Sequence, residues 1–134
     1  MSLELLALLA CFLTLLASLL AQALYLDVKA GLRYAFSSRD QPEPHMSPLK
    51  GRLDRNLRNQ VEGMALLLPL VVILELAGLS SALTTYGAVL YAAMRPLFAL
   101  AYILDWVPWR TVIWLIGLAS LLVMFAGLAT QALN

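Results

Sequence analysis

The chain has 134 residues, of which 62% are hydrophobic and 13% charged, and its formal net charge is +1. Soluble domains are about 45–50% apolar and about 25% charged, so this composition lacks the polar surface that a soluble globule needs. The near-zero charge gives no basic field for nucleic acid, and one cysteine and one histidine (Cys11 and His45) exclude a disulfide framework and a metal centre built from these residues.

The first apolar segment, from Leu5 to Leu26, contains no charged residue. A helix needs about 20 apolar residues to cross the hydrocarbon of a bilayer. The segment exceeds the roughly 7–15 residues of a signal-peptide core, and no basic segment precedes it. We therefore expect a retained membrane span over residues 3–27, with Glu4 at its edge.

Three more spans are expected over residues 53–77, 81–104 and 109–132. Pro108 directly before the last apolar run is typical of a helix start. The short connections make consecutive helices antiparallel neighbours. The sequence thus predicts an all-α membrane protein with four transmembrane helices in a single domain, residues 1–134.

The loop over residues 28–52 is the only long connection, and it holds most of the Lys and Arg found outside the spans. Arg110 follows the third span on the same side, whereas the turn after the second span has no basic residue. Basic loops stay in the cytoplasm. We expect a multi-pass protein of the cell (inner) membrane, with the long loop cytoplasmic and both termini outside.

Charged residues inside a span are costly and usually face a bundle interior or a cavity. In the second span, Arg55, Asn59 and Glu62 share one helical face, and Arg58 forms an i,i+4 pair with Glu62. The rise from Arg52 to Glu62 is about 15 Å, so Glu62 lies well below the interface. The outer half of the bundle is expected to hold only Glu75.

The third span carries Tyr91, Arg95, Phe98 and Tyr102 on one stripe, and Arg110 opens the fourth span. Together with the second span, these helices bring four arginines and one glutamate to a similar depth. Arginine binds carboxylates bidentately, and a buried glutamate suits an ammonium group, so the cluster fits a small anion with several carboxylates and one amine. In the alternative interpretation, the arginines pair with Glu62 and reach to the interface without a ligand.

These residues resemble the motifs of the MAPEG family, the membrane-associated proteins in eicosanoid and glutathione metabolism. The resemblance spans roughly residues 28–128, and the loop Ser38-Arg-Asp-Gln-Pro is similar to that of bacterial members. Its three motifs, one on each of the last three spans, are Arg52-x-x-Arg55-x-x-Arg58-Asn59-x-x-Glu62, Arg95-x-x-x-x-x-x-Tyr102 and Pro108-Trp-Arg110-Thr-x-x-Trp114.

The resemblance implies a homotrimer that binds glutathione as a cosubstrate between neighbouring subunits near the cytoplasmic side. Glu62 would then take the γ-glutamyl ammonium, and Arg110 would hold the thiol as its nucleophilic thiolate. The carboxylates, amides and remaining polar groups of glutathione would be served by Arg55, Arg58, Asn59, Arg95 and Tyr102. The implied activity is a glutathione transferase acting on apolar electrophiles from the bilayer, with reduction of lipid hydroperoxides as a second activity.

Two other functions remain open. Relatives often have Tyr or His where this chain has Phe98, and Pro96 follows Arg95 directly, features that favour a non-catalytic binding or scaffold protein with the same fold. A proton-coupled drug exporter would need an acid inside the first span, where this chain offers only Glu4 at the edge.

Overall fold

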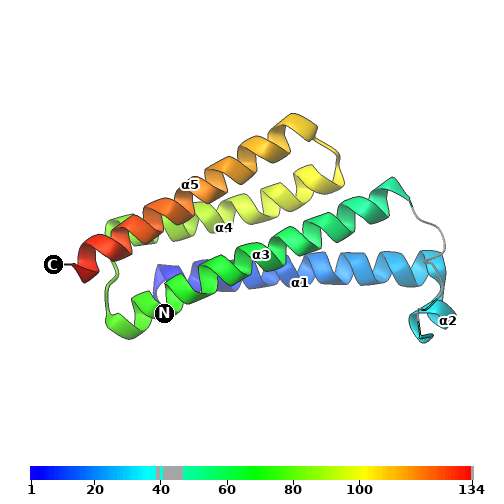
Figure 1. Ribbon diagram of the computed structural model, residues 1–134, viewed down its shortest axis with the longest axis horizontal. Coiled ribbons are helices and arrows are strands. Elements are labelled where there is room, and N and C mark those ends of the chain that lie inside the picture. Colours follow the sequence, from blue (N-terminus) through cyan, green and yellow to red (C-terminus); the bar gives the residue numbers. More distant parts are fainter. Residues whose placement is uncertain (39, 41–46, 134) are drawn as a thin grey trace.

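Four long helices and one short helix form the regular structure in the computed structural model, which describes residues 1–38, 40 and 47–133 (Figure 1). Each long helix is long and apolar enough to cross a membrane. The predicted all-α, four-span fold is therefore confirmed, and the chain is a multi-pass membrane protein. The elements in chain order are α1 (Leu3–Ala30), α2 (Leu32–Ala35), α3 (Pro48–Ala77), α4 (Ala82–Ile103) and α5 (Val107–Ala132).

The helical segments reach further into the long loop than its expected bounds of 28–52. Helix α3 begins at Pro48, because the Ser47 side chain accepts a hydrogen bond from the Lys50 amide and proline suits the first turn. The Lys50 ammonium also pairs with the Asp54 carboxylate at 2.5 Å, one turn further on. Three features of the sequence analysis, namely Arg39, residues 41–44 and His45, lie outside the described residues.

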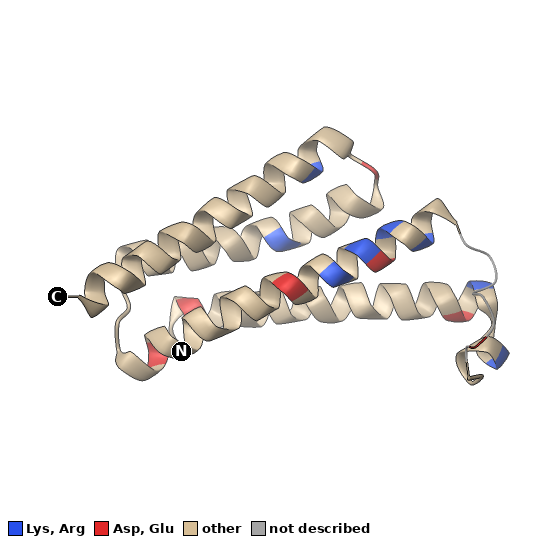
Figure 2. Ribbon diagram, viewed as in Figure 1, with Lys and Arg blue, Asp and Glu red and all other residues tan. Residues whose placement is uncertain are grey.

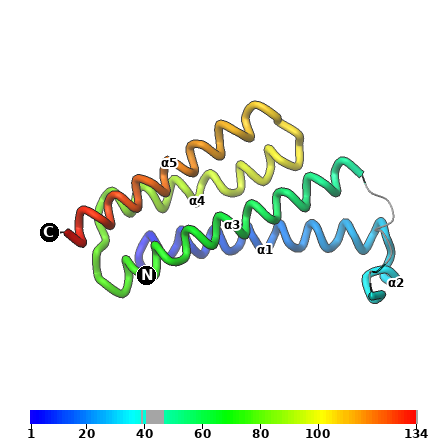
Figure 3. The backbone as a smooth tube through the Cα atoms, in the orientation of Figure 1, coloured from blue at the N-terminus to red at the C-terminus, as the bar shows by residue number. Residues whose placement is uncertain are grey.

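The long helices run in alternating directions (Figure 3). Both termini and the α3–α4 turn lie at one end of the bundle, called here the terminal end, and the other two connections lie at the opposite loop end. Helix α4 packs most extensively against α5, and α1 contacts both α3 and α4. Helix α3 makes far fewer contacts with α4 and α5, and this loosely packed side of α3 is where the cavities described below are found.

Two glycines set the close packing of α4 on α5. A Cβ on Gly87 would lie 2.7 Å from the carbonyl oxygen of Ser120, and one on Gly127 would lie 2.9 Å from the Leu83 Cβ. Small residues at a helix crossing let backbones approach closely, as is common between membrane helices. The pair α4–α5 therefore forms a tight wall that fixes Arg95 relative to Arg110.

The terminal end contains a buried carboxylate, that of Glu4, which lies in the first turn of α1 at the edge of the span. Glu4 is 1% exposed, and its Oε1 atom accepts hydrogen bonds from the hydroxyls of Ser80, Thr84 and Thr85 at 2.7, 2.9 and 2.8 Å. The exposed Glu75 accepts a hydrogen bond from the Ser2 hydroxyl. The terminal end thus holds two carboxylates with hydroxyl partners, and the burial of Glu4 depends on the α3–α4 turn folding over the start of α1.

Candidate functional site

Basic residues are confined to one part of the bundle. Figure 2 shows the Lys and Arg positions toward the loop end, where acidic positions also occur, whereas the charged positions of the terminal end are acidic. Apart from Lys29 in the last turn of α1, the basic residues of the long helices are on α3, on the middle of α4 and on the first turn of α5. The last three helices build a cationic region on the side where α3 packs loosely.

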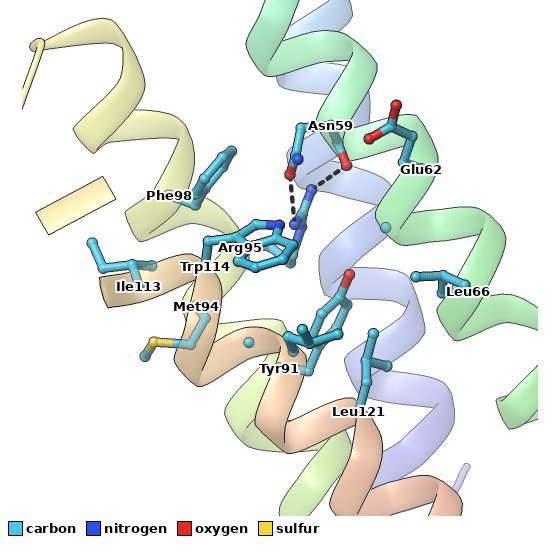
Figure 4. Close-up of a pocket in the computed structure, with 13 residues that line it drawn as sticks. Asn59, Glu62, Leu66, Tyr91, Met94, Arg95, Phe98, Ile113, Trp114 and Leu121 are labelled. Atoms are coloured by element: carbon cyan, nitrogen blue, oxygen red, sulfur yellow. Dashed lines mark hydrogen bonds between the residues drawn. The ribbon is translucent and has the colours of Figure 1, made fainter. Parts of the chain in front are cut away.

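Arg95 is the most deeply buried of these arginines, being 6% exposed. Its Nε donates to the Gln60 Oε1 at 2.8 Å, while the two terminal nitrogens donate to the Asn59 side-chain and backbone oxygens at 3.2 and 2.8 Å (Figure 4). The rings of Tyr91 and Phe98 each lie 5.5 Å from its guanidinium carbon. Arg95 is therefore held in one orientation and ties α4 to α3.

The Arg95 position persists although Pro96 follows it directly. Helix α4 continues through Pro96 to Ile103 as one helix. Proline removes one backbone hydrogen bond from the helix interior, here the one that the Ala92 carbonyl would accept. The carbonyl oxygen of Arg95 accepts a separate hydrogen bond from the Gln60 amide at 3.2 Å, which links α4 to α3 beside the proline.

Nearer the loop end, two arginines lie close to the ring of Tyr102. The guanidinium carbon of Arg110 lies 4.6 Å from the ring centroid, and that of Arg55 lies 6.0 Å away. A cavity of about 190 Å³, called here the upper cavity, is lined by Asn59, Tyr102, Arg110 and aromatic neighbours. Residues from α3, α4 and α5 thus meet around one small space.

A second cavity, called here the lower cavity, lies next to the first and has a volume of about 110 Å³. Asn59, Phe98 and Trp114 line both cavities, so the two are adjacent. Glu62, Tyr91 and Arg95 provide the polar part of the lower cavity, and the rest of its wall is mainly apolar (Figure 4). The combined space has a cationic end and an apolar end.

The structure brings six of the seven predicted site residues to these cavities. Asn59, Glu62, Arg95, Tyr102 and Arg110 line them, and Arg55 contacts the Tyr102 ring. Arg58 is exposed on α3 and lines neither cavity. In the described part of the chain, Arg58 and Glu62 do not form the ion pair that their i,i+4 spacing predicts.

Two residues at the site were not identified from the sequence. Gln60 is 2% exposed and both donates to and accepts from Arg95. The sequence feature that could have identified Gln60 is its position next to Asn59, on the span that faces Arg95. Gly63 is the second, because a Cβ at this position would lie 2.4 Å from the Tyr91 hydroxyl and 2.9 Å from the Arg95 guanidinium carbon.

The free charge at the site is positive. Among the described residues, the ion pairs are Lys50–Asp54 and Arg52–Asp105, and none involves Arg55, Arg95 or Arg110. Arg95 directs three of its five N–H groups to acceptors within the protein. Arg55 and Arg110 contact the Tyr102 ring and make no ion pair in the described part of the chain, so their donors are available to an added anion. A ligand with carboxylate or thiolate groups would satisfy both.

The model of one protein family, described as the MAPEG family, matches residues 3–130 of the chain. This match includes all four spans and every residue of the two cavities. The chain belongs to the MAPEG family. Comparisons with curated proteins and with solved structures gave no match.

Membership in MAPEG agrees with the arrangement of the cationic region. The motif residues of the resemblance lie on α3, α4 and α5, and these helices line both cavities. Where many MAPEG proteins carry Tyr or His, Phe98 packs against Tyr102 with ring centroids 5.3 Å apart. The MAPEG fold of this chain therefore keeps an arginine-rich site with a more apolar wall at that position.

Proposed function

We propose that this MAPEG protein is a glutathione transferase that joins glutathione to apolar electrophiles taken from the bilayer. The observation that carries the proposal is the pair Arg55 and Arg110 on the Tyr102 ring, beside a cavity and without a carboxylate partner in the described chain. Glutathione has two carboxylates, one ammonium and one thiol, which match the charges available at this site.

The residues divide the binding of glutathione between them. Glu62 faces the ammonium group, and Arg55 and Arg58 bind the carboxylates. Asn59 hydrogen-bonds to the amides of the peptide, and the Tyr102 hydroxyl donates to one of its acceptor oxygens. Arg95 serves mainly by orienting Asn59, because its nitrogens already donate to that residue and to Gln60. Arg110 lies next to the thiol and stabilises the thiolate, which is the nucleophile.

The chemical step needs no further cofactor. The thiolate sulfur attacks an electrophilic carbon, a carbon–sulfur bond forms, and a leaving group such as halide departs with its electron pair. Because the lower cavity is mainly apolar, a lipophilic substrate enters from the membrane. Reduction of a lipid hydroperoxide by the same thiolate is a second activity within the proposal.

The proposal extends to the assembly and its orientation. Arg58 and Glu62 are exposed on the single chain, and a neighbouring subunit of a homotrimer would enclose these charges and complete the glutathione site. An exposed charge at span depth is costly in lipid, so burial against a second subunit lowers that cost. In this arrangement the loop end faces the cytoplasm, where glutathione is available, in the cell (inner) membrane.

Replacing Arg110 tests the proposed chemistry. An aqueous thiol has a pKa of about 8.5, so without the neighbouring cation only a few per cent of glutathione is thiolate at neutral pH. We expect Arg110→Ala to lower conjugation of 1-chloro-2,4-dinitrobenzene by about 10- to 100-fold at neutral pH, with a smaller deficit at higher pH. Glutathione affinity, measured by calorimetry, should change much less.

Arg33→Ala is the matched control, because Arg33 is exposed on α2 and lines neither cavity. It should leave both turnover and affinity unchanged. Turnover of Arg110→Ala equal to that of the unmodified protein would reject the role of Arg110.

A non-catalytic binding or scaffold protein is the second candidate. The observation that favours it is the set of three hydrogen bonds that Arg95 donates to Gln60 and Asn59, which hold α4 on α3 and give this arginine a structural role. Calorimetry on detergent-solubilised protein separates the two functions. Binding of glutathione together with turnover supports the transferase, and absence of binding at millimolar glutathione supports the scaffold.

A further inference from the structure

The lower cavity contains a polar group that the proposed glutathione site does not use. The Tyr91 side chain on α4 is 3% exposed, and its hydroxyl has no hydrogen-bond partner among the described residues. Figure 4 shows the ring rising between Arg95 and Leu66, with the hydroxyl directed toward α3. Among the described residues, the enclosed side-chain polar atom that lacks a hydrogen-bond partner is the Nε of Arg52. The Tyr91 hydroxyl is therefore not sealed inside the protein. It is open to the lower cavity, where a bound molecule can reach it.

The chain gives this hydroxyl room through Gly63. A Cβ at position 63 would lie 2.4 Å from the Tyr91 hydroxyl oxygen and 2.9 Å from the Arg95 guanidinium carbon. Because neither distance is tolerated by real side chains, only glycine lets both groups occupy this place. Any larger residue would displace the hydroxyl from the cavity or move the guanidinium away from Asn59.

The surroundings define the chemistry of the missing partner. Arg95 directs three of its five N–H groups to internal acceptors. Glu62, of opposite charge, lines the same cavity, so the cavity has no net charge that would select a charged molecule. The rest of the wall includes Leu66, Met94, Ile113 and Leu121. This combination suits an apolar molecule with one neutral hydrogen-bond acceptor.

We infer that the lower cavity binds the electrophilic substrate, and that the Tyr91 hydroxyl donates a hydrogen bond to a carbonyl oxygen of that substrate. The inference rests on the proposed glutathione chemistry for its reaction step. It assigns Tyr91 as a substrate-contacting residue and α,β-unsaturated carbonyl compounds as the preferred substrate class. Adjacency of the two cavities, which share Asn59, Phe98 and Trp114, places the thiolate within reach of the bound electrophile.

The addition step balances without an oxidant or reductant. The thiolate sulfur forms a bond to the β-carbon, the carbon–carbon π bond breaks, and its electron pair moves through the α-carbon onto the carbonyl oxygen as an enolate. The Tyr91 hydroxyl donates to that oxygen as its negative charge develops, which is where a preorganised donor is most effective. A proton from solvent then neutralises the enolate and gives the saturated carbonyl adduct.

Tyr91→Phe tests the inference, because it removes the hydroxyl and keeps the ring that packs on Arg95. The two probe electrophiles are 4-phenyl-3-buten-2-one, which has a carbonyl oxygen, and 1-bromohexane, which has none. Loss of one such donor lowers turnover by about 100-fold, so we expect kcat/KM for the enone to fall by roughly that factor, with bromohexane unchanged. Tyr86→Phe is the matched control, since Tyr86 is exposed on the same helix.

Equal losses for both electrophiles would show a merely structural role, and no loss for either would show that the hydroxyl binds only water. Either result overturns the inference. A second measurement is independent of glutathione: the infrared carbonyl band of ¹³C-labelled 4-phenyl-2-butanone bound to the detergent-solubilised protein. We expect a band at lower wavenumber in the unmodified protein than in Tyr91→Phe, and equal positions would overturn the inference.

The two measurements also separate this inference from the proposed function. A carbonyl shift that Tyr91→Phe abolishes, in a protein that conjugates no electrophile, would support the substrate contact and reject the transferase. Conjugation with no difference between the two electrophiles in Tyr91→Phe would support the transferase and reject the contact.

Discussion

At the scale of single residues, Glu4 is the side chain whose environment differs most from its sequence context. Its Oε1 accepts three hydroxyl hydrogen bonds while only 1% of the residue is exposed. Its partners lie at least 76 positions away in the chain. The sequence places Glu4 at the edge of its span, where α1 begins. Its burial could not be predicted, because which turn covers that edge depends on how the helices assemble.

Removal of this acceptor should destabilise the protein. Glu4→Leu leaves the hydroxyls of Ser80, Thr84 and Thr85 without their shared acceptor, and a buried unsatisfied polar group costs about 1–3 kcal/mol. We expect a loss of at least about 1 kcal/mol in the free energy of unfolding, measured by titration with denaturing detergent. Glu75→Leu is the control, because that exposed carboxylate accepts from Ser2 alone; equal losses would contradict the importance of the buried cluster.

Part of the candidate site could be predicted from the spacing of its residues, and part depends on how the helices pack. The spacing of Arg55, Asn59 and Glu62 predicted a shared face on α3, and five predicted residues line the two cavities. Gln60 was missed because its role depends on hydrogen bonds to Arg95, which lies on a different helix. The ligand roles of these residues stay predictions until binding is measured.

At the scale of helices, the four apolar runs coincide with the four long helices, and the start of α3 departs most from the expected bounds. There Lys50 and Arg52 were assigned to the loop because of their charge. The helix nevertheless begins at Pro48 because Ser47 caps it and Lys50 pairs with Asp54. Local capping chemistry outweighed polarity, as it does when charged side chains extend toward an interface.

The contact between α4 and α5 should respond sharply to side-chain size at its glycines. Gly87→Ala would place a Cβ 2.7 Å from a backbone oxygen of α5. Overpacking of this kind lowers the free energy of unfolding by about 1–3 kcal/mol. Gly117→Ala is the matched control, since its Cβ would meet Tyr91 at an ordinary 3.7 Å. We expect the free energy of unfolding to fall only for Gly87→Ala; similar values for both variants would contradict the tight crossing.

At the scale of the whole molecule, the distribution of basic residues predicts the orientation in the membrane. Leu133 lies at the terminal end and is 87% exposed, and Ser37 lies exposed at the loop end. In right-side-out vesicles, an impermeant maleimide should label Leu133→Cys and should label Ser37→Cys only after permeabilisation. The native Cys11 is buried and gives little background, and the reverse labelling pattern would contradict the cytoplasmic placement of the loop end.

The whole-molecule arrangement also explains why both cavities lie on one side of α3. Helix α1 packs on α3 and α4, the pair α4–α5 is tightly joined, and α3 touches α4 and α5 sparingly. The polar contacts of Arg95 bridge that sparse interface beside both cavities. A MAPEG bundle of this kind presents a cationic pocket next to an apolar one, which suits a reaction between a charged thiol compound and a lipophilic partner.

A crystal structure determined with glutathione is the most direct test of the proposed function. We expect density for the tripeptide beside Glu62, with a carboxylate within hydrogen-bond distance of Arg55, the sulfur next to Arg110, and a second subunit closing the site over Arg58. An empty site at saturating glutathione, or glutathione bound away from Arg110, would contradict the proposal that this protein activates the glutathione thiol.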